Sequence, residues 1–211
     1  MRTATDFNQY YAKPDPWQIS RARFRDRVLR RCVKKTVAGR SVLELGCGEG
    51  HLTGAIFSSA RSVTGVDLSD VAISRAQAKG LANAQFKATD FLNTSFKGFD
   101  VIAAIECLYY LTPADQTAFF DKVAREHSGR ELILSAPIVG ANKFRRYFTH
   151  TELMATFASH HMTVTAFHNL NVNRCGVLTT AAAVAARIVP AILDWLPASM
   201  IYQRLYKIRI M

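Results

Sequence analysis

The sequence predicts an α/β fold in which helices cover both faces of a mainly parallel sheet. Short apolar runs alternate along the chain with amphipathic segments, which is the pattern of successive β–α units. Several of the amphipathic segments begin at residues that cap helices. The chain has 211 residues, of which 49% are hydrophobic and 20% charged. This length and composition suit one folded domain with a sizeable core.

Seven short runs predict the strands of this sheet. Six of them are apolar runs near residues 41–45, 62–66, 84–89, 99–105, 131–136 and 162–167. The seventh, residues 205–210, alternates apolar and polar side chains with a period of two, as a half-exposed strand does.

Capping residues predict three of the helices between these runs. Ser69 can cap a helix that continues to about residue 79. Thr112 stands directly before Pro113, which suits the first helical position, and Thr149 forms a capping box with Glu152. Each signal lies where a helix must connect two parallel strands.

Residues 21–35 predict a strongly basic helix ahead of the first strand. Trp17, Phe24, Val28 and Cys32 recur at helical spacing, so that one face can pack on the domain. Such a helix favours a phosphate, an anionic lipid or an acidic glycan, and the alternative is a solvated helix without a partner. Eight basic residues surround the apolar face, with Asp26 as the single acid: Arg21, Arg23, Arg25, Arg27, Arg30, Arg31, Lys34 and Lys35.

Residues 176–202 form an apolar segment between the last two predicted strands. Arg187, Pro190, Asp194 and Pro197 interrupt it too often for a helix that spans a membrane, which needs about twenty apolar residues. Two short amphipathic helices are expected instead. They either cap the site or, together with the basic residues of the last strand, rest on an anionic membrane.

The composition indicates a reducing, cytoplasmic environment. The four cysteines are widely separated and form no CxxC pair, so free thiols are expected rather than disulfides or a zinc site. The first twenty residues lack the apolar core of a secretory signal. The six histidines have no metal-ligand spacing with nearby acids, and no metal is expected.

Residues 42–50 run from an apolar strand into a tight glycine turn, with the sequence VLELGCGEG. Asp67 follows the second predicted strand, and Asp90 follows the third. This order is the pattern of a nucleotide-type cofactor pocket, in which glycines let the backbone approach the ligand and an acid accepts hydrogen bonds from ribose hydroxyls. A dinucleotide fingerprint would need a glycine where the chain has His51. The alternative is an ordinary turn with a solvated acid.

Together these residues resemble the S-adenosylmethionine (SAM) binding region of class I methyltransferases, over about residues 40–170. The resemblance implies a Rossmann-like, seven-stranded, mostly parallel sheet with N-terminal helices, a helical insertion before the last strand, and a last strand that is antiparallel.

The same resemblance implies a role for each cofactor residue. Glu44 would lie near the methionine amino group, and the backbone of the glycine turn would pass against the cofactor. Asp67 would hold the ribose, and Asp90 would face the adenine amine. The residues expected to bind SAM are Glu44, Gly46, Cys47, Gly48, Asp67, Leu68, Asp90 and Phe91.

The acceptor chemistry is expected at the carboxyl ends of the parallel strands, where open α/β sheets bind ligands. Glu106, Tyr109 and Tyr110 follow the fourth predicted strand. Methyl transfer needs positioning and charge complementarity, and an ammonium or hydroxyl acceptor also needs a base. Glu106 is the candidate base, Tyr109 its candidate catalytic neighbour, and Tyr110 a candidate substrate contact. The alternative is that Glu106 orders the loop and the tyrosines pack beneath the next helix.

A narrower resemblance, to the nodulation-protein-S group of N-methyltransferases, rests on two motifs. They are Asp15-Pro16-Trp17 and the sequence ECLYYL at residues 106–111. Enzymes of that group methylate an amine on a chitooligosaccharide. The likeness makes Trp17 a candidate substrate contact in an N-terminal lid, with a hydrophobic staple for the following helix as the alternative.

Two further basic features are candidate ligand contacts. Arg146 and Tyr147 belong to a basic cluster after the fifth predicted strand, on the acceptor side, and are candidate substrate contacts. A charged loop with buried aromatic residues is the alternative. One arginine of the basic helix, such as Arg27, is a candidate for the SAM carboxylate, although the sequence does not choose among them.

The resemblance thus implies a SAM-dependent methyltransferase that acts on an amine or hydroxyl of a small-molecule, sugar or lipid-linked acceptor. A single domain is expected over residues 1–211. Its parts are an N-terminal lid and basic helix (1–38), a cofactor-binding core (39–170), and a helical cap with the last strand (171–211). Peripheral membrane contact through the basic helix and the C-terminal apolar segment is a further expectation.

Two alternatives remain at this stage. The net charge of +11 suggests a nucleic-acid methyltransferase. Against it, the fourth strand is followed by no Asn-Pro-Pro-Tyr or Asp-Pro-Pro-Tyr motif, and the chain has no separate RNA-binding module. The other alternative is a binding protein that keeps the fold without the chemistry. The sequence leaves the acceptor, N- or O-methylation and the oligomeric state open.

Overall fold

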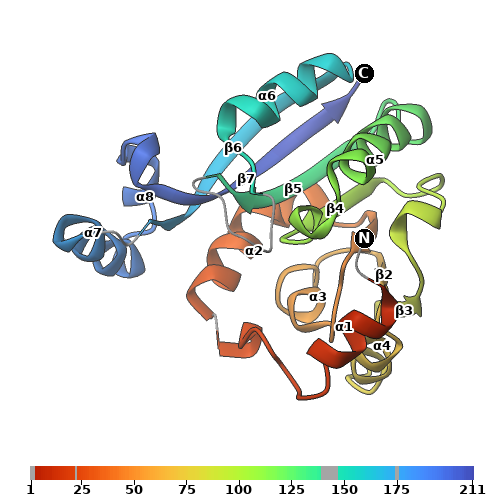
Figure 1. Ribbon diagram of the computed structural model, residues 1–211. Helices are drawn as coiled ribbons and strands as arrows, with labels where there is room; N and C mark the ends of the chain where they lie inside the picture. The colour runs from red at the N-terminus through yellow and green to blue at the C-terminus, as the bar shows by residue number, and fades with distance from the viewer. Residues whose placement is uncertain (1–2, 22, 139–146, 174–175) are drawn as a thin grey trace.

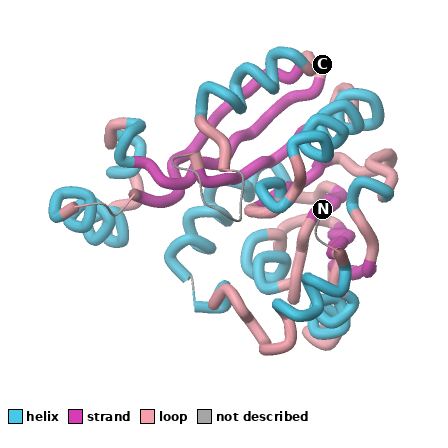
Figure 2. Tube along the Cα trace, viewed as in Figure 1, coloured by secondary structure: helices cyan, strands magenta, loops and turns pink. Residues whose placement is uncertain are grey.

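A computed structural model describes residues 3–21, 23–138, 147–173 and 176–211. Figures 1 and 2 show a central sheet with helices packed on both of its faces. In the described part of the chain the sheet has seven strands in the order β3-β2-β1-β4-β5-β7-β6. The predicted fold class is therefore confirmed. The strands are β1 (Ser41–Leu45), β2 (Ser62–Asp67), β3 (Ala84–Ala88), β4 (Val101–Ile105), β5 (Glu131–Pro137), β6 (Met162–Val172) and β7 (Ile201–Ile210).

The first five strands are parallel, and β7 is antiparallel to both of its neighbours, β5 and β6. The antiparallel last strand was expected. Eight α-helices and four short 3₁₀ helices connect the strands in the described residues. The α-helices are α1 (Ala4–Tyr10), α2 (Arg23–Val37), α3 (His51–Ile56), α4 (Asp70–Gln77), α5 (Pro113–Glu126), α6 (His150–Ser159), α7 (Val177–Ile188) and α8 (Ile192–Trp195). The 3₁₀ helices are η1 (Ile19–Arg21), η2 (Phe91–Asn93), η3 (Leu108–Tyr110) and η4 (Ala198–Met200).

The alternation of side chains along a strand divides the core into two layers. Val101, Ala103 and Ile105 of β4 pack in a cluster with α2 and α3 on one face of the sheet. The intervening Ile102 and Ala104 pack in a cluster with α5 and α6 on the other face. A strand that is buried on both faces reads as a continuous apolar run, which is why β4 was recognisable in the sequence.

The predicted capping residues begin three of the helices. The Ser69 hydroxyl accepts a hydrogen bond from the backbone of Ala72, and Thr112 caps α5 with Pro113 at its first position. Thr149 and Glu152 form the predicted capping box of α6. Each cap satisfies backbone N–H groups that have no partner inside the helix.

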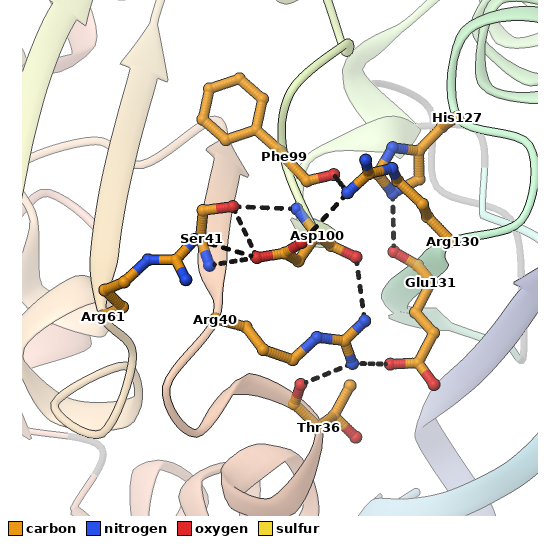
Figure 3. Close-up of polar contacts among 9 residues, drawn as sticks. All are labelled: Thr36, Arg40, Ser41, Arg61, Phe99, Asp100, His127, Arg130 and Glu131. Carbon is orange, nitrogen blue, oxygen red and sulfur yellow. Dashed lines mark hydrogen bonds and ion pairs between the residues drawn. The ribbon is translucent and has the colours of Figure 1, made fainter.

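A polar network ties together the amino ends of the central parallel strands (Figure 3). Asp100, just before β4, accepts hydrogen bonds from the backbone N and the hydroxyl of Ser41 on β1, at 2.9 and 2.8 Å. Its carboxylate also pairs with Arg61 at 3.3 Å and with Arg130 at 3.0 Å. Arg40 joins the network through an ion pair with Glu131 on β5. These contacts lie at the sheet edge opposite the carboxyl ends of the parallel strands.

The last two strands are longer than predicted. β6 continues to Val172, and β7 begins at Ile201 rather than at residue 205. β7 is hydrogen-bonded on both sides, so Gln203 and Arg204 are buried, and the run does not alternate in the way that marks a half-exposed strand. The predicted pair of helices before the last strand is present as α7 and α8, which project beyond the end of the sheet in Figure 1.

Candidate active site

The glycine turn after β1 is packed tightly from two sides. Gly46 and Gly48 have φ angles of +66° and +53°, in the region that favours glycine. A Cβ atom on Gly46 would lie 2.7 Å from the Cβ of Cys107, which follows β4. One on Gly48 would lie 2.5 Å from the hydroxyl of Tyr11, in the N-terminal segment. The turn therefore requires glycines because the β4 end and the N-terminal segment both close on it.

Asp67 stands beside this turn at the end of β2 and is 8% exposed. Its two carboxylate oxygens accept hydrogen bonds from the backbone N–H groups of Gly48 and Ser69, each at 2.9 Å. Burial raises the pKa of Asp67, and the bonds from Ser69, Gly48 and Leu68 oppose that rise. A carboxylate offers about four acceptor sites, so Asp67 keeps capacity for a hydroxyl of a ligand.

Glu44 lies behind the turn and does not line the pocket described below. The residue is 2% exposed and accepts a hydrogen bond from the hydroxyl of Thr53 on α3. Burial raises the pKa of Glu44 to about 8, the Thr53 bond opposes the rise, and the charge of Asp67 adds to it. The role of Glu44 toward the methionine amino group stays a prediction.

Asp90 and Phe91 follow β3 and line the same pocket, as does Leu68 after Asp67. The Asp90 carboxylate caps the 3₁₀ helix η2 by accepting a hydrogen bond from the backbone N of Leu92 at 2.9 Å. This cap holds Asp90 and Phe91 at the carboxyl edge of the sheet, next to the strand that bears Asp67.

Glu106 is the first residue after β4 and has a φ angle of +58°. A non-glycine residue in this region is uncommon and strained, and such residues cluster at functional sites. One of its oxygens accepts a hydrogen bond from the hydroxyl of Ser135 at 2.9 Å, and the other accepts one from Tyr109 at 3.4 Å. Burial raises the pKa of Glu106, while Ser135, Gln203 and the charge of Arg25 oppose that rise.

Aromatic rings form one wall beside Glu106. Tyr110 contacts Trp17 with ring centroids 6.4 Å apart and Phe7 with centroids 5.7 Å apart, so the β4 loop touches the N-terminal segment. Tyr109 packs on Tyr110 at 4.8 Å. Tyr147 stands behind this wall, with its ring 5.5 Å from that of Tyr109, and does not line the pocket.

The lid segment, residues 3–21, is held over the glycine turn by a cluster around Glu49. The Glu49 carboxylate accepts a hydrogen bond from the backbone N of Asp15 at 2.9 Å and pairs with Arg75 at 2.7 Å and His51 at 3.2 Å. Asp15, Glu49 and His51 each bring one potential metal-ligand atom within 4.8 Å of the others. Asp15, however, accepts bonds from Ile19 and Ser20, and Glu49 is paired, so the cluster is interpreted as a latch.

One pocket of about 430 Å³ joins these parts, within the ~300–1,000 Å³ typical of small-molecule sites. The described candidates that it does not include are Glu44, Tyr147 and Arg27, and Arg146 lies outside the described residues. The predicted site residues that line the pocket are Trp17, Gly46, Cys47, Gly48, Asp67, Leu68, Asp90, Phe91, Glu106, Tyr109 and Tyr110. Residues predicted from five separate stretches of sequence thus meet in one place.

The pocket also contains residues that the sequence analysis did not single out. Tyr11 lies over Gly48, and Gln203 of β7 lies near Glu106 with its Nε2 atom buried and without a well-formed hydrogen bond among the described residues. Arg25 lines the pocket, whereas Arg27, named as a candidate for the SAM carboxylate, is exposed and does not. The helical phase of α2 therefore turns Arg25, and not Arg27, toward the pocket.

The comparisons with known proteins agree with this geometry. Residues 42–126 match the family model described as a methyltransferase domain. The ubiquinone biosynthesis O-methyltransferase of Pseudomonas syringae pv. tomato is 26% identical over 149 residues, which cover 58% of this chain and 64% of that protein. The chain thus spans slightly less than two thirds of that relative's length.

Solved structures match over nearly the whole chain. The N-methyltransferase NodS from Bradyrhizobium japonicum WM9, in complex with S-adenosyl-L-homocysteine (SAH), covers 100% of this chain and 99% of its own, with a TM-score of 0.72 and 21% identity. The fold is that of a class I methyltransferase. The Burkholderia thailandensis 1,6-didemethyltoxoflavin-N1-methyltransferase with bound SAH covers 99% of this chain and 87% of its own, with a TM-score of 0.68 and 18% identity.

The predicted resemblance to class I SAM-dependent methyltransferases, and more weakly to the nodulation-protein-S enzymes, is therefore confirmed. The family model describes a methyltransferase domain, and the NodS and toxoflavin-methyltransferase structures contain SAH. The roles assigned to individual site residues are not tested by them and stay predictions.

Proposed function

We propose that the protein is a SAM-dependent methyltransferase whose acceptor is an amine or a hydroxyl of a small molecule. The observation that carries this proposal is the single pocket in which the glycine turn, Asp67, Asp90 and Glu106 meet at the carboxyl ends of β1 to β4. The match of residues 42–126 to the methyltransferase domain supports the reaction class.

The residues present fit the cofactor. Asp67 is buried, is oriented by backbone N–H groups and keeps acceptor capacity for a ribose hydroxyl. Asp90, fixed by its cap on η2, offers acceptors for the adenine amine, and Leu68 and Phe91 offer apolar surface beside it. Arg25 supplies a guanidinium suited to a carboxylate.

When bound, SAM supplies a methyl group activated by its positive sulfonium. The protein's part is to orient the acceptor and to take its proton. Glu106 is the group that can accept this proton, because its raised pKa brings it closer to neutrality, where a general base is most effective. Ser135 fixes the carboxylate, and the Trp17 and Tyr110 rings hold the acceptor and exclude water.

The finer identity of the acceptor is also a proposal. Aromatic rings next to a carboxylate and the amides of Gln203 and Asn171 suit an ammonium group or a sugar-like ring with several polar substituents. A glycan or lipid-linked acceptor, a cytoplasmic location and peripheral membrane contact belong to this proposal. The net charge of +11 supports an anionic acceptor or surface.

Calorimetric titration with SAH and, in parallel, with NAD tests the cofactor assignment. We expect SAH alone to bind, and we expect Asp67→Ala to weaken SAH binding by about tenfold or more through loss of a charge-assisted hydrogen bond. Lys97→Gln, an exposed change outside the pocket, is the control. A folded protein that does not bind SAH would favour a binding protein that keeps the fold without the chemistry. Unchanged affinity in Asp67→Ala would mean that the ribose site is misassigned.

A further inference from the structure

The segment of residues 176–200, here called the arm, projects from the end of the sheet and carries α7 and α8 (Figures 1 and 2). Six of the ten large hydrophobic side chains that are exposed in the described structure lie on it. They are Val177, Leu178, Val184, Ile188, Val189 and Trp195. A concentration of this kind on a monomer usually marks an interaction surface.

Helix α7 is packed with its small side chains inward. Thr179, Ala183 and Ala186 are buried, whereas Val177 and Ile188 are 88% and 80% exposed. Val177, Val184 and Ile188 are spaced by seven and four residues, so they share one stripe of the helix. The helix can sit close to its support because the inward side chains are small, and its larger apolar stripe is turned to solvent. Packing among the described residues leaves this stripe uncovered.

The arm borders the basic helix α2. Phe24 of α2 packs against a buried cluster in which Ala183 and Leu193 of the arm meet Val172 of β6. Burial raises the pKa of Cys32 on α2 to about 11, and the carboxylate of Asp194 on α8 adds to the rise, as expected of close neighbours. The exposed basic residues of α2 are Arg27, Arg30, Arg31, Lys34 and Lys35.

Charge distinguishes between two possible partners of this surface, a second copy of the chain and an anionic lipid bilayer. From residue 153 to residue 211 the only acid is Asp194, and α2 has only Asp26. Two copies of the chain would bring like charges together, since the net charge of each is +11. An anionic lipid surface is attracted by the basic residues and receives the apolar stripe at the same time. Exposed Trp195 suits the interface between lipid and water.

We propose that the apolar stripe of α7 with Trp195, flanked by the basic residues of α2, docks the protein on an anionic lipid bilayer. None of the described helices is long and apolar enough to cross the bilayer, so the contact is interfacial. Apolar burial and basic attraction are two weak signals that together give stable binding. The inference does not depend on methyl transfer, since none of the arm side chains concerned lines the pocket.

Vesicle flotation tests the proposal. The full chain is mixed with vesicles of phosphatidylcholine alone, or of phosphatidylcholine with phosphatidylserine, at low and high salt. We expect binding to the anionic vesicles that weakens with salt. The variant Val177→Ser/Ile188→Ser/Trp195→Ser, and separately Arg30→Gln/Lys34→Gln, should each reduce it by about tenfold or more. These five side chains are exposed, so the variants should fold.

Matched controls separate the arm from general surface effects. Met154→Ser/Met211→Ser removes exposed apolar residues elsewhere, and Lys87→Gln/Lys97→Gln removes basic residues, with Lys87 on the opposite edge strand β3. Both should bind vesicles as the parent does. The chain has two tryptophans, so Trp17→Phe leaves Trp195 as the sole reporter, and its emission should shift to the blue on anionic vesicles.

Three results would overturn the proposal. One is equal binding to both vesicle types or no binding to either. Another is binding that the triple arm variant does not change. The third is a dimer, seen by light scattering, that the triple arm variant dissociates in a protein that does not bind vesicles. In that case the stripe is a contact between copies of the chain. SAH binding measured on the same samples reports the pocket separately.

Discussion

At the scale of single residues, Glu106 combines several features of a functional side chain. It has a strained φ of +58°, lies at the carboxyl end of β4, and is held by Ser135 and Tyr109. Strain at such a position persists only because the surrounding structure enforces it. Glu106 lines the pocket and also accepts a bond from Tyr109 of its own loop, so its catalytic role stays a prediction beside the loop-ordering alternative.

We predict that Glu106→Gln lowers turnover by about 10²–10⁴-fold, the usual contribution of a general base. The amide keeps the size of the side chain and can still accept the Ser135 bond, so SAH affinity should stay within about twofold. Because burial raises the pKa of Glu106 and the base acts when unprotonated, the rate of the parent should fall as pH decreases through that pKa. Single-turnover kinetics with an acceptor from the proposed class measure the rate of methyl transfer in the variant and the pH dependence of that rate in the parent. Full activity in the variant would remove Glu106 from catalysis.

Glu44 gives a pH-dependent contribution to stability. Its pKa is about 8 in the folded chain against an ordinary value of 4.5. Between these pH values the folded chain holds a proton that the unfolded chain releases, so the free energy of unfolding falls as pH rises. The total is on the order of a few kcal/mol. We predict that the free energy of unfolding of Glu44→Gln does not fall in this way. The variant should therefore become more stable relative to the parent between pH 5 and pH 8. Urea unfolding at several pH values measures the free energy of unfolding of both proteins. If it changed with pH in the same way in both, Glu44 would not have the raised pKa assigned to it.

The sequence analysis named the acidic residues of the pocket but missed some of the other residues that line it. Asp67 and Asp90 were found because an acid at a strand end is visible as a local pattern. Tyr11 and Gln203 were missed because their place depends on long-range packing: Tyr11 closes over Gly48, and the β7 register sets Gln203 opposite Pro137 on β5. Glu44 was found by motif, but the alternation of β1 turns it toward Thr53.

At the scale of elements, the buried carboxylate of Glu49 is one anchor of the lid segment, beside the bonds of Asn8 with Ser69 and Asp70. Glu49 receives the backbone N of Asp15 and pairs with Arg75, so it links the lid segment to the glycine turn and to α4. Asp15 itself has a φ of +48°, a strained turn that the latch maintains. Local openings of this kind have much smaller free energies than global unfolding.

We predict that Glu49→Ala frees the lid segment while the rest of the fold stays intact. Trypsin should cleave after exposed Arg21, the basic residue of the lid segment that no proline follows, about tenfold faster than in the parent, with a similar thermal midpoint. SAH should restore part of the protection, because a ligand in the pocket contacts the lid residues. Asp121→Ala, at an exposed acid on α5, is the control and should leave cleavage unchanged. Equal rates in Glu49→Ala and the parent would mean that the lid is held by its other contacts, the aromatic packing of Trp17 and the bonds of Asn8 with Ser69 and Asp70.

Element boundaries followed the sequence wherever a local cause decides them. The caps at Ser69, Thr112 and Thr149 start helices through bonds within three residues, and these starts were predicted correctly. The start of β7 was misplaced by four residues, because pairing on both sides buries Gln203 and Arg204 and hides the alternation. Tertiary context overrides local pattern there.

At the scale of the whole molecule, the two ends of the parallel strands differ in function: the carboxyl ends, here called the carboxyl edge, line the pocket, and the amino ends, the amino edge, contribute to stability. The carboxyl edge carries the strained Glu106 and a buried acid with spare acceptor capacity, which are costly for stability. The amino edge carries the network around Asp100, whose carboxylate accepts bonds from both the backbone N and the hydroxyl of Ser41 (Figure 3). The prediction of a single domain with its three parts stays a prediction, and the continuous sheet agrees with it.

This separation predicts that the amino edge can be weakened without changing ligand binding. Asp100→Ala leaves the buried N–H of Ser41 without its partner, so the free energy of unfolding should fall by about 1–3 kcal/mol. Bonds from Ser41 lower the pKa of Asp100, so its contribution is present above the ordinary pKa and is lost as pH falls through the folded value. The loss in Asp100→Ala should therefore be large at pH 7 and shrink in acid. The midpoint of urea unfolding, followed at several pH values, measures it.

The affinity of the folded Asp100→Ala variant for SAH should stay within about twofold of the parent, since Asp100 lies at the far ends of the strands that hold the pocket. Arg61→Gln, which removes an exposed ion pair from the same network, should cost less than about 1 kcal/mol. A fall in SAH affinity that matches the fall in stability would show that the strands transmit strain from one edge to the other. Stability and ligand binding could then no longer be assigned to separate edges of the sheet.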